Sequence, residues 1–149
     1  TEVKNFASLK SMMIRSSYDA WLILKDHISY EQEEVWCLAL NSISQVLGKR
    51  MIFRGTVDSC PLHARDLFRY LISVNSNQFI IAHSHPSQNP SPSSQDFELT
   101  NRVSLLAFLM EIHLIDHLIL APQSYFSFSE SSLLKQVNDF EESLGGLVR

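Results

Sequence analysis

Short apolar runs alternate with amphipathic segments along most of the chain. The runs are typical of buried strands, and they fall at 35–40, 51–53, 79–82, 117–120 and 125–128. The segments between them space their apolar residues as helices do, over 18–28, from 59, from 96 and from 129. This order predicts an α/β fold, or α+β, with a mixed β-sheet flanked by helices.

Each predicted helix has a start signal and an apolar face. Ser17 or Asp19 could cap the first helix, Pro61 suits the first turn of the second, and Ser129 could cap the last. The predicted apolar faces are Tyr18, Trp21, Ile23, Leu24 and Ile28; Leu67, Phe68, Leu71 and Ile72; Val103, Leu106 and Met110; and Leu133, Leu134, Val137 and Phe140.

Length and composition indicate one globular domain. The chain has 149 residues, of which 45% are hydrophobic and 19% charged, and no apolar run is long enough to span a membrane. We expect an N-terminal arm over 1–16, the domain over 17–129 and a C-terminal helix and tail over 130–149. Cys37 and Cys60 form neither a disulfide framework nor a zinc ribbon, which favours a reducing, cytoplasmic compartment.

The charge balance does not favour nucleic acid as a partner. The net charge is −4, so no global field attracts phosphate, although a local basic patch at Lys49, Arg50 and Arg54 leaves nucleic acid possible. A solvated strand or turn is the favoured interpretation of that patch. The sequence leaves the oligomeric state open.

The densest chemistry lies between residues 83 and 96. His83 and His85 stand two apart at the end of an apolar run, so a strand would point both imidazoles to one side. Ser93 and Asp96 follow at the predicted start of a helix. Two imidazoles and one carboxylate can hold one zinc ion with a fourth position open, which is the ligand count of a catalytic site.

A structural interpretation of the same residues competes with the metal site. Ser93 and Asp96 fit the pattern of a helix capping box, which needs no metal. Taken separately, each piece is more often structural, but the combination directly after a buried strand favours metal binding by His83, His85 and Asp96.

The segment 83–96 resembles the H-x-H-x7-S-x-x-D signature of the JAMM metalloenzymes, also called JAB or MPN, and most of all their RadC branch. Ser84 and Gln88 replace the usual Asn and Gly of that branch. The segments 53–56, 116–119 and 125–127 are similar to other parts of the family pattern. The resemblance implies a layered fold related to that of cytidine deaminases, one zinc ion per chain, and cleavage of peptide or isopeptide bonds in a protein or peptide substrate, sometimes a ubiquitin-like modifier.

The resemblance also implies two catalytic residues. A glutamate on an early strand acts on the metal-bound water, and the family pattern places it at Glu33 rather than Glu34 or Glu31. Ser93 is expected to stabilise the oxyanion of the intermediate. Asp116 and His117 could orient a metal-bound histidine, or could be structural.

Two other functions remain open at this point. RadC proteins are traditionally labelled as DNA-repair proteins, so a binding module without peptidase activity is the alternative, although the acidic net charge does not support it. A scaffold with a vestigial site ranks last because all three candidate ligands are present. Cys60 and His63 are expected to have no role in catalysis.

Overall fold

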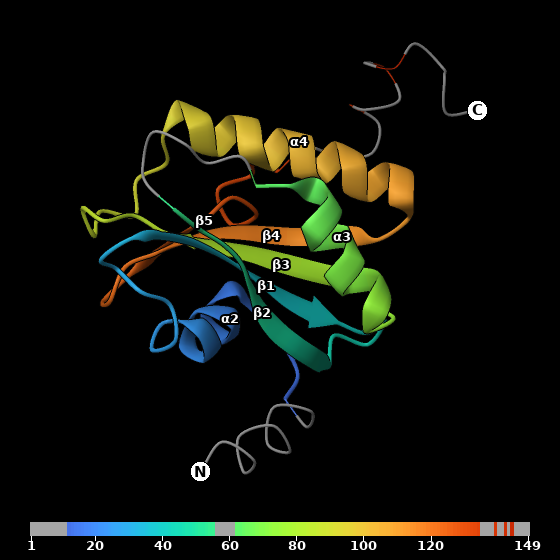
Figure 1. The fold of residues 1–149 in the computed structure, drawn as a ribbon, viewed down its shortest axis with the longest axis horizontal. Coiled ribbons are helices and arrows are strands. Elements are labelled where there is room, and N and C mark those ends of the chain that lie inside the picture. The colour runs from blue at the N-terminus through green and yellow to red at the C-terminus, as the bar shows by residue number, and fades with distance from the viewer. Residues whose placement is uncertain (1–11, 56–61, 135–138, 140–141, 143, 145–149) are drawn as a thin grey trace.

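The computed structural model of the chain describes residues 12–55 and 62–134, together with residues 139, 142 and 144. Its elements are α2 (Ser17–Leu24), β1 (Glu33–Leu40), β2 (Val46–Gly55), α3 (Ala64–Ser73), β3 (Gln78–Ser84), α4 (Ser94–Met110), β4 (His113–Leu120) and β5 (Tyr125–Ser127). They form a five-stranded sheet in the order β2-β1-β3-β4-β5 (Figure 1). The β3–β4 pair is parallel and the other pairs are antiparallel, so the predicted α/β fold with a mixed sheet is confirmed.

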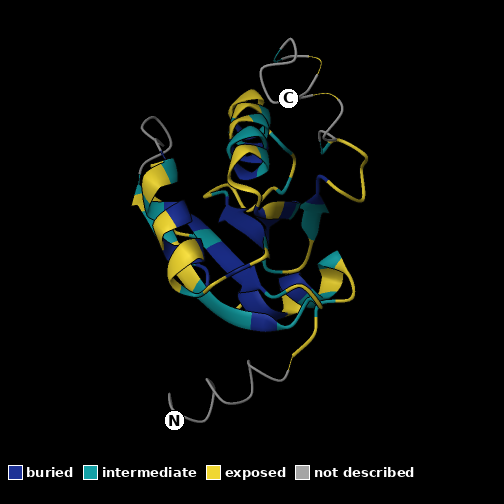
Figure 2. Ribbon diagram, turned by 90° about the vertical axis from the view of Figure 1, so that its right-hand side faces the viewer, coloured by how far each residue is buried: buried dark blue, intermediate teal, exposed yellow. Residues whose placement is uncertain are grey.

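The sheet is the middle layer of a three-layer molecule (Figures 1 and 2). Alternate residues of β1 enter two different cores. Val35, Cys37 and Ala39 pack with α3 and α4, whereas Leu38 and Leu40 pack with α2. Burial on both faces explains why β1 reads as a continuous apolar run instead of an alternating pattern.

Four of the five strands are longer than the apolar runs that predicted them, and β5 ends at Ser127, one residue earlier than expected. β2 covers Val46–Gly55, whereas only 51–53 was expected, and β4 begins at His113 instead of His117. β2 is an edge strand whose residues are mostly exposed or half-buried, so a purely apolar criterion misses its polar positions. Backbone pairing with β1 and β3 defines both extensions.

The first helix is shorter than predicted, and its N-cap lies one residue before Ser17, the nearer of the two expected caps. It ends at Leu24, and Ser16 is the N-cap, accepting a hydrogen bond from the backbone N–H of Asp19. The hydroxyl of Ser17 instead donates to Asp116 at 2.6 Å. Tyr18 is 50% exposed, so the buried face is narrower than the apolar face of the sequence.

The helix α3 starts at Ala64 and buries a face that differs from the prediction at one position. Leu67, Phe68 and Leu71 are buried as expected, but Tyr70 is buried in place of Ile72, which is 57% exposed. Successive helical residues are about 100° apart, which places Ile72 well away from the centre of the buried stripe. The predicted start at Ser59-Cys60-Pro61, and with it Cys60, lies outside the described residues.

The predicted C-terminal helix does not begin at Ser129. Residues 128–132 form a turn, in which the N–H of Leu133 donates to the carbonyl of Phe128 and Ser132 has a φ of 57°. Ser129 uses its backbone N–H to bind the carboxylate of Asp116 instead of capping a helix. Val137 and Phe140 of the predicted apolar face lie outside the described residues.

The N-terminal segment is partly described. Met13 forms an isolated antiparallel bridge with Gln45, and the N–H of Ile14 donates to the carbonyl of Ser44. Residues 12–14 are therefore attached to the turn before β2. Over the part of the chain that the structure describes, no helix is long and apolar enough to cross a membrane.

One end of the sheet brings together segments that are distant in sequence. β1 begins there with Glu33, β3 ends there with Ser84, and α4 begins close by at Ser94. Val35 of β1 is in register with His83 of β3. The β3-α4-β4 unit places a helix N-terminus beside the carboxyl ends of two parallel strands, where α/β sheets usually bind ligands.

Candidate metal centre

Three side chains from the β3 end and the α4 start point their ligand atoms at one another. Nε2 of His83 lies 3.2 Å from Oδ1 of Asp96, and Nε2 of His85 lies 3.0 Å from Oδ2 of the same carboxylate. All three residues can offer ligand atoms within 4.8 Å of one another. These are the residues that the sequence predicted as metal ligands.

The end of β3 places the two histidines. His83 is the next-to-last strand residue and is 1% exposed, while His85 is the first residue after the strand and is half-buried. Their rings meet edge to face at a centroid distance of 4.7 Å. Ser84 points elsewhere, because its hydroxyl donates to the carbonyl of Gln32 and accepts from the N–H of Glu34.

Asp96 is both a capping residue and a member of the cluster. Ser93 is the N-cap of α4: its hydroxyl accepts from the N–H of Asp96, and Oδ2 of Asp96 accepts from the N–H of Ser93 at 2.7 Å. The capping box therefore exists, and it leaves Oδ1 directed at His83. Burial acts to raise the pKa of Asp96, but bonds from His85 and Ser93 and the nearby His83 lower it below its usual range.

Hydrogen bonds determine which nitrogen of His85 faces the cluster. Nδ1 lies 2.9 Å from the carbonyl oxygen of Asn89, which can only accept, so Nδ1 carries the proton. In the neutral ring the lone pair is then on Nε2, the nitrogen on the Asp96 side that a metal ion would use. When no metal is bound, a proton on Nε2 can be donated to Asp96, which raises the pKa of His85 and outweighs burial, which lowers it; the Asn89 carbonyl raises it further.

The donor set fits a metal ion. Nε2 of His83 is buried, and although oxygens of Asp96 and Glu33 lie within 3.2 Å of it, neither contact has the geometry of a hydrogen bond. A buried nitrogen without a partner is costly, and a cation on its lone pair would remove that cost. Two imidazoles and one carboxylate are suitable ligands for zinc and for related divalent ions.

The three candidate glutamates occupy different surroundings. Oε1 of Glu33 lies 3.1 Å from Nε2 of His83, so this carboxylate borders the cluster. Glu34 points to the other side of β1, where its side chain is 1% exposed and pairs with Arg54 at 2.7 Å. Glu31 is exposed. Only Glu33 of the three is placed to act on a group held by His83 and Asp96.

Glu34 is a structural carboxylate. It accepts hydrogen bonds from the N–H of Ser29, from the indole of Trp36 and from Arg54, the last through two nitrogens. Burial acts to raise its pKa, but these four bonds together hold the pKa below its ordinary value.

Two buried polar residues, His117 and Thr100, are linked to His83 through Nδ1 of its ring. Nδ1 of His83 lies 3.3 Å from Nε2 of His117, and Nδ1 of His117 contacts the hydroxyl of Thr100. Burial lowers the pKa of His117 strongly, and His83 lowers it further. His117 was a candidate from the sequence, whereas Thr100 was missed. Its only signal is the spacing of four residues from Asp96, which places both on one helix face.

The buried carboxylate of Asp116 connects α2, β4 and β5 through hydrogen bonds. Its carboxylate accepts from the hydroxyls of Ser17 and Ser127 and from the N–H groups of His117 and Ser129. Burial raises the pKa of Asp116 despite these bonds, which lower it. Asp116 does not contact the histidine rings through its side chain, so its role is to hold α2, β4 and β5 together.

Comparison with known proteins identifies the family. The family model of the RadC-like JAB domain matches residues 14–133. The chain belongs to this family. The match includes the whole His83, His85 and Asp96 cluster and supports the resemblance seen in the signature.

Several bacterial proteins are similar to this RadC-like JAB domain. The UPF0758 protein YsxA of Bacillus subtilis is 34% identical over 135 residues, which cover 90% of the chain and 58% of YsxA. A UPF0758 protein of Clostridium kluyveri is 36% identical over 115 residues, covering 77% of the chain and 50% of that protein. The chain thus spans about half the length of the curated relatives it matches.

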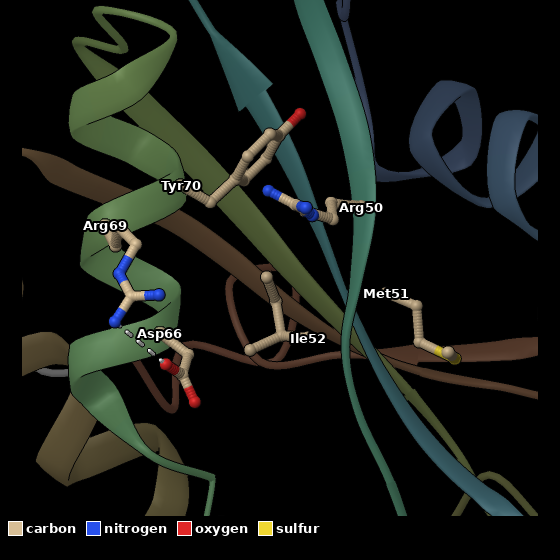
Figure 3. A pocket seen from close by; sticks show the side chains of 6 residues that line it. All are labelled: Arg50, Met51, Ile52, Asp66, Arg69 and Tyr70. Carbon is tan, nitrogen blue, oxygen red and sulfur yellow. Dashed lines mark ion pairs between the residues drawn. The ribbon is translucent and has the colours of Figure 1, made fainter.

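A separate hollow of about 200 Å³ lies on this RadC-like JAB domain between β2 and α3 (Figure 3). It is lined by Arg50, Met51, Ile52, Asp66, Arg69 and Tyr70. Its charged groups are already engaged, since Arg69 pairs with Asp66 at 3.8 Å and the Arg50 guanidinium lies 5.6 Å from the centre of the Tyr70 ring. None of its lining residues belongs to the metal cluster, and we assign it no chemistry.

Two of the three basic residues noted in the sequence have partners within the fold. Lys49, Arg50 and Arg54 all lie on β2, but Arg54 is committed to Glu34 and Arg50 to Tyr70. His63 is exposed and precedes α3 without a capping bond from its side chain.

Proposed function

We propose that this RadC-like JAB domain is a zinc-dependent hydrolase that cleaves peptide or isopeptide bonds in a protein or peptide substrate. The observation that carries the proposal is the convergence of His83, His85 and Asp96 around a buried nitrogen without a hydrogen-bond partner, with the Glu33 carboxylate beside it. A capping box alone requires neither the histidines nor the glutamate.

His83, His85 and Asp96 would hold one zinc ion per chain through Nε2, Nε2 and Oδ1. Zinc is the proposed metal because its catalytic sites commonly combine imidazole and carboxylate ligands in threes. When bound with an open position, it supplies Lewis acidity and lowers the pKa of a bound water to about 7.

The remaining roles belong to the side chains of the chain itself. Glu33 would receive the proton of the attacking water at its carboxylate and return it to the leaving amine. Its position 3.1 Å from His83 supports this role. The hydroxyl of Ser93 accepts from Asp96, which leaves its own proton to donate to the substrate oxygen as negative charge develops there.

The substrate class follows from this chemistry and from the family resemblance. Attack by an activated water with proton return to an amine suits an amide bond. The loop over 86–93, which connects His85 to the start of α4, is the proposed contact surface, because specificity in such folds lies on loops around a rigid site. The turn over 41–45 follows Leu40, which pairs with Gln78 at the opposite end of the sheet, so it is not part of this surface.

Metal content and a Glu33→Gln variant test the proposal. Elemental mass spectrometry on untagged protein should find about one zinc per chain in both the wild type and Glu33→Gln. Cleavage of a peptide library and of ubiquitin-like fusions, followed by mass spectrometry, should fall by roughly 100-fold or more in the variant.

Glu31→Gln is the matched control because Glu31 is exposed and lies two residues away on the same segment. It should retain wild-type zinc content and cleavage. A zinc-free wild type that takes up no added zinc would refute the metal site, and full cleavage by Glu33→Gln would refute the role of Glu33.

A further inference from the structure

We propose that Thr100 and His117 are positioning residues that hold His83 in one tautomer, with its Nε2 lone pair directed at the metal position. The inference rests on the proposed metal site and deepens it. It gives a function to two buried polar residues that are not themselves proposed metal ligands or catalytic groups.

The proposed relay is the series of hydrogen bonds that runs from the carbonyl of Asp96 through Thr100 and His117 to His83. Its first bond fixes the position of the Thr100 proton. The Thr100 hydroxyl donates to the carbonyl oxygen of Asp96 at 2.7 Å, one helical turn earlier. A carbonyl can only accept, and a hydroxyl has only one proton. Toward any other partner, Thr100 must therefore accept.

The next member is His117, whose Nδ1 contacts the same hydroxyl. Because the Thr100 proton is already used, Nδ1 of His117 carries the shared proton. Thr100 is 1% exposed and His117 is fully buried, so water does not offer a competing partner. In the neutral ring, the lone pair is then on Nε2.

The last step reaches the metal ligand. Nε2 of His117 lies 3.3 Å from Nδ1 of His83, so His83 must donate from Nδ1. In the neutral ring its own lone pair is consequently on Nε2, the atom that faces Glu33 and Asp96 and that a metal ion would use. If the relay ran the other way, His83 would carry its proton on Nε2 and could not bind a metal there.

The surroundings fix the His117 ring against rotation. Phe128 stacks on it nearly in parallel, with an angle of 5° and a centroid distance of 4.8 Å. Its backbone is held on both sides, because its N–H donates to Asp116 and its carbonyl accepts from the N–H of Phe128. The ring therefore presents the same two nitrogens to Thr100 and His83.

The relay also connects two ligands of the same site. It begins at the backbone carbonyl of Asp96 and ends at the ring of His83. Placement of α4 thus sets both the Asp96 carboxylate and the proton position on His83. Partners of this kind typically contribute 10- to 100-fold to metal affinity.

The decisive comparison is Thr100→Val against Thr100→Ser. Valine keeps the shape and removes the hydroxyl, whereas serine keeps the hydroxyl. Long-range ¹H–¹⁵N NMR on metal-free protein reports the tautomer of each histidine, and zinc affinity is measured by competition with a chromophoric chelator.

We expect the wild type and Thr100→Ser to show His83 protonated on Nδ1 and to bind zinc alike. Thr100→Val should shift His83 toward protonation on Nε2 and bind zinc about 10- to 100-fold more weakly. Ser104→Ala controls for changes within α4, since Ser104 is buried and its hydroxyl has no hydrogen-bond partner among the described residues. It should leave both readouts unchanged.

Failure of the relay is distinguishable from failure of the proposed function. Zinc binding by the wild type with unchanged affinity and tautomer in Thr100→Val would overturn the relay alone. A wild-type His83 that carries its proton on Nε2 and not on Nδ1 would overturn it without any metal measurement. A folded wild type that binds no zinc would overturn the metal site itself.

Discussion

Two adjacent glutamates on β1 have different surroundings because successive strand residues face opposite sides. Glu33 borders the histidine cluster, whereas Glu34 is buried against Arg54, Trp36 and Ser29. An exchange of their roles would need the strand to shift by one residue, which would also exchange every core contact of β1.

Glu34→Gln should destabilise the fold at neutral pH by about 2 kcal/mol, because charged hydrogen bonds of a 1% exposed side chain are lost. Glu34 has a pKa below its ordinary value in the folded state. Its stabilisation is therefore present above the unfolded pKa of about 4.3 and is lost as pH falls through the folded pKa. Denaturant unfolding from pH 7 to pH 3 should show the free energies of unfolding of the wild type and of Glu34→Gln converging at low pH.

The control is Glu31→Gln, whose free energy of unfolding should stay within about 0.5 kcal/mol of that of the wild type.

The loop between β3 and α4 carries a strained residue. Gln88 has a φ of 60°, the left-handed region that favours glycine, and its N–H donates to the carbonyl of His85. The RadC branch usually has glycine here, and the structure supplies the reason. The loop must turn sharply to return the chain from His85 to the cap at Ser93.

Gln88→Gly should increase the free energy of unfolding by up to about 1 kcal/mol, because the relief of left-handed strain exceeds the added entropy of the unfolded chain. Thermal or chemical unfolding measures the difference. Ser91→Gly, in the same loop but without a positive φ, should be neutral or destabilising. Equal stabilisation by both glycines would contradict the strain argument.

The proposed metal position joins segments from across the whole fold, so an ion bound there should stabilise the entire domain. Its proposed ligands come from the end of β3 and the start of α4, and Glu33 comes from β1. An ion that binds only the folded state adds stability according to its concentration relative to the dissociation constant.

Zinc at 100 times its dissociation constant should stabilise the wild type by about 2.7 kcal/mol. At about 2–4 °C per kcal/mol for this size class, the Tm should rise by roughly 5–10 °C in differential scanning calorimetry. His85→Ala is the control, since His85 is half-buried and its loss removes a ligand while sparing the core. A similar rise in His85→Ala would place zinc binding elsewhere.

The sequence alone determined the layer order, the buried strands β1 and β3, and the cluster of His83, His85 and Asp96. These depend on local periodicity and short spacing, which a linear pattern records. Strand lengths, the exposed Ile72 and the turn at 128–132 were not predictable, because backbone pairing and packing set them.

Only the tertiary structure decided which polar residues meet. Thr100, His117 and Glu33 come from three different elements, and their contacts around His83 form only in the folded chain. The family pattern indicated Glu33 and the sequence offered His117 as a candidate, whereas Thr100 was missed. The sheet register, the capping box of α4 and the β3-α4-β4 connection place them together. Contacts between elements distant in sequence follow from packing in three dimensions, which composition and periodicity do not encode.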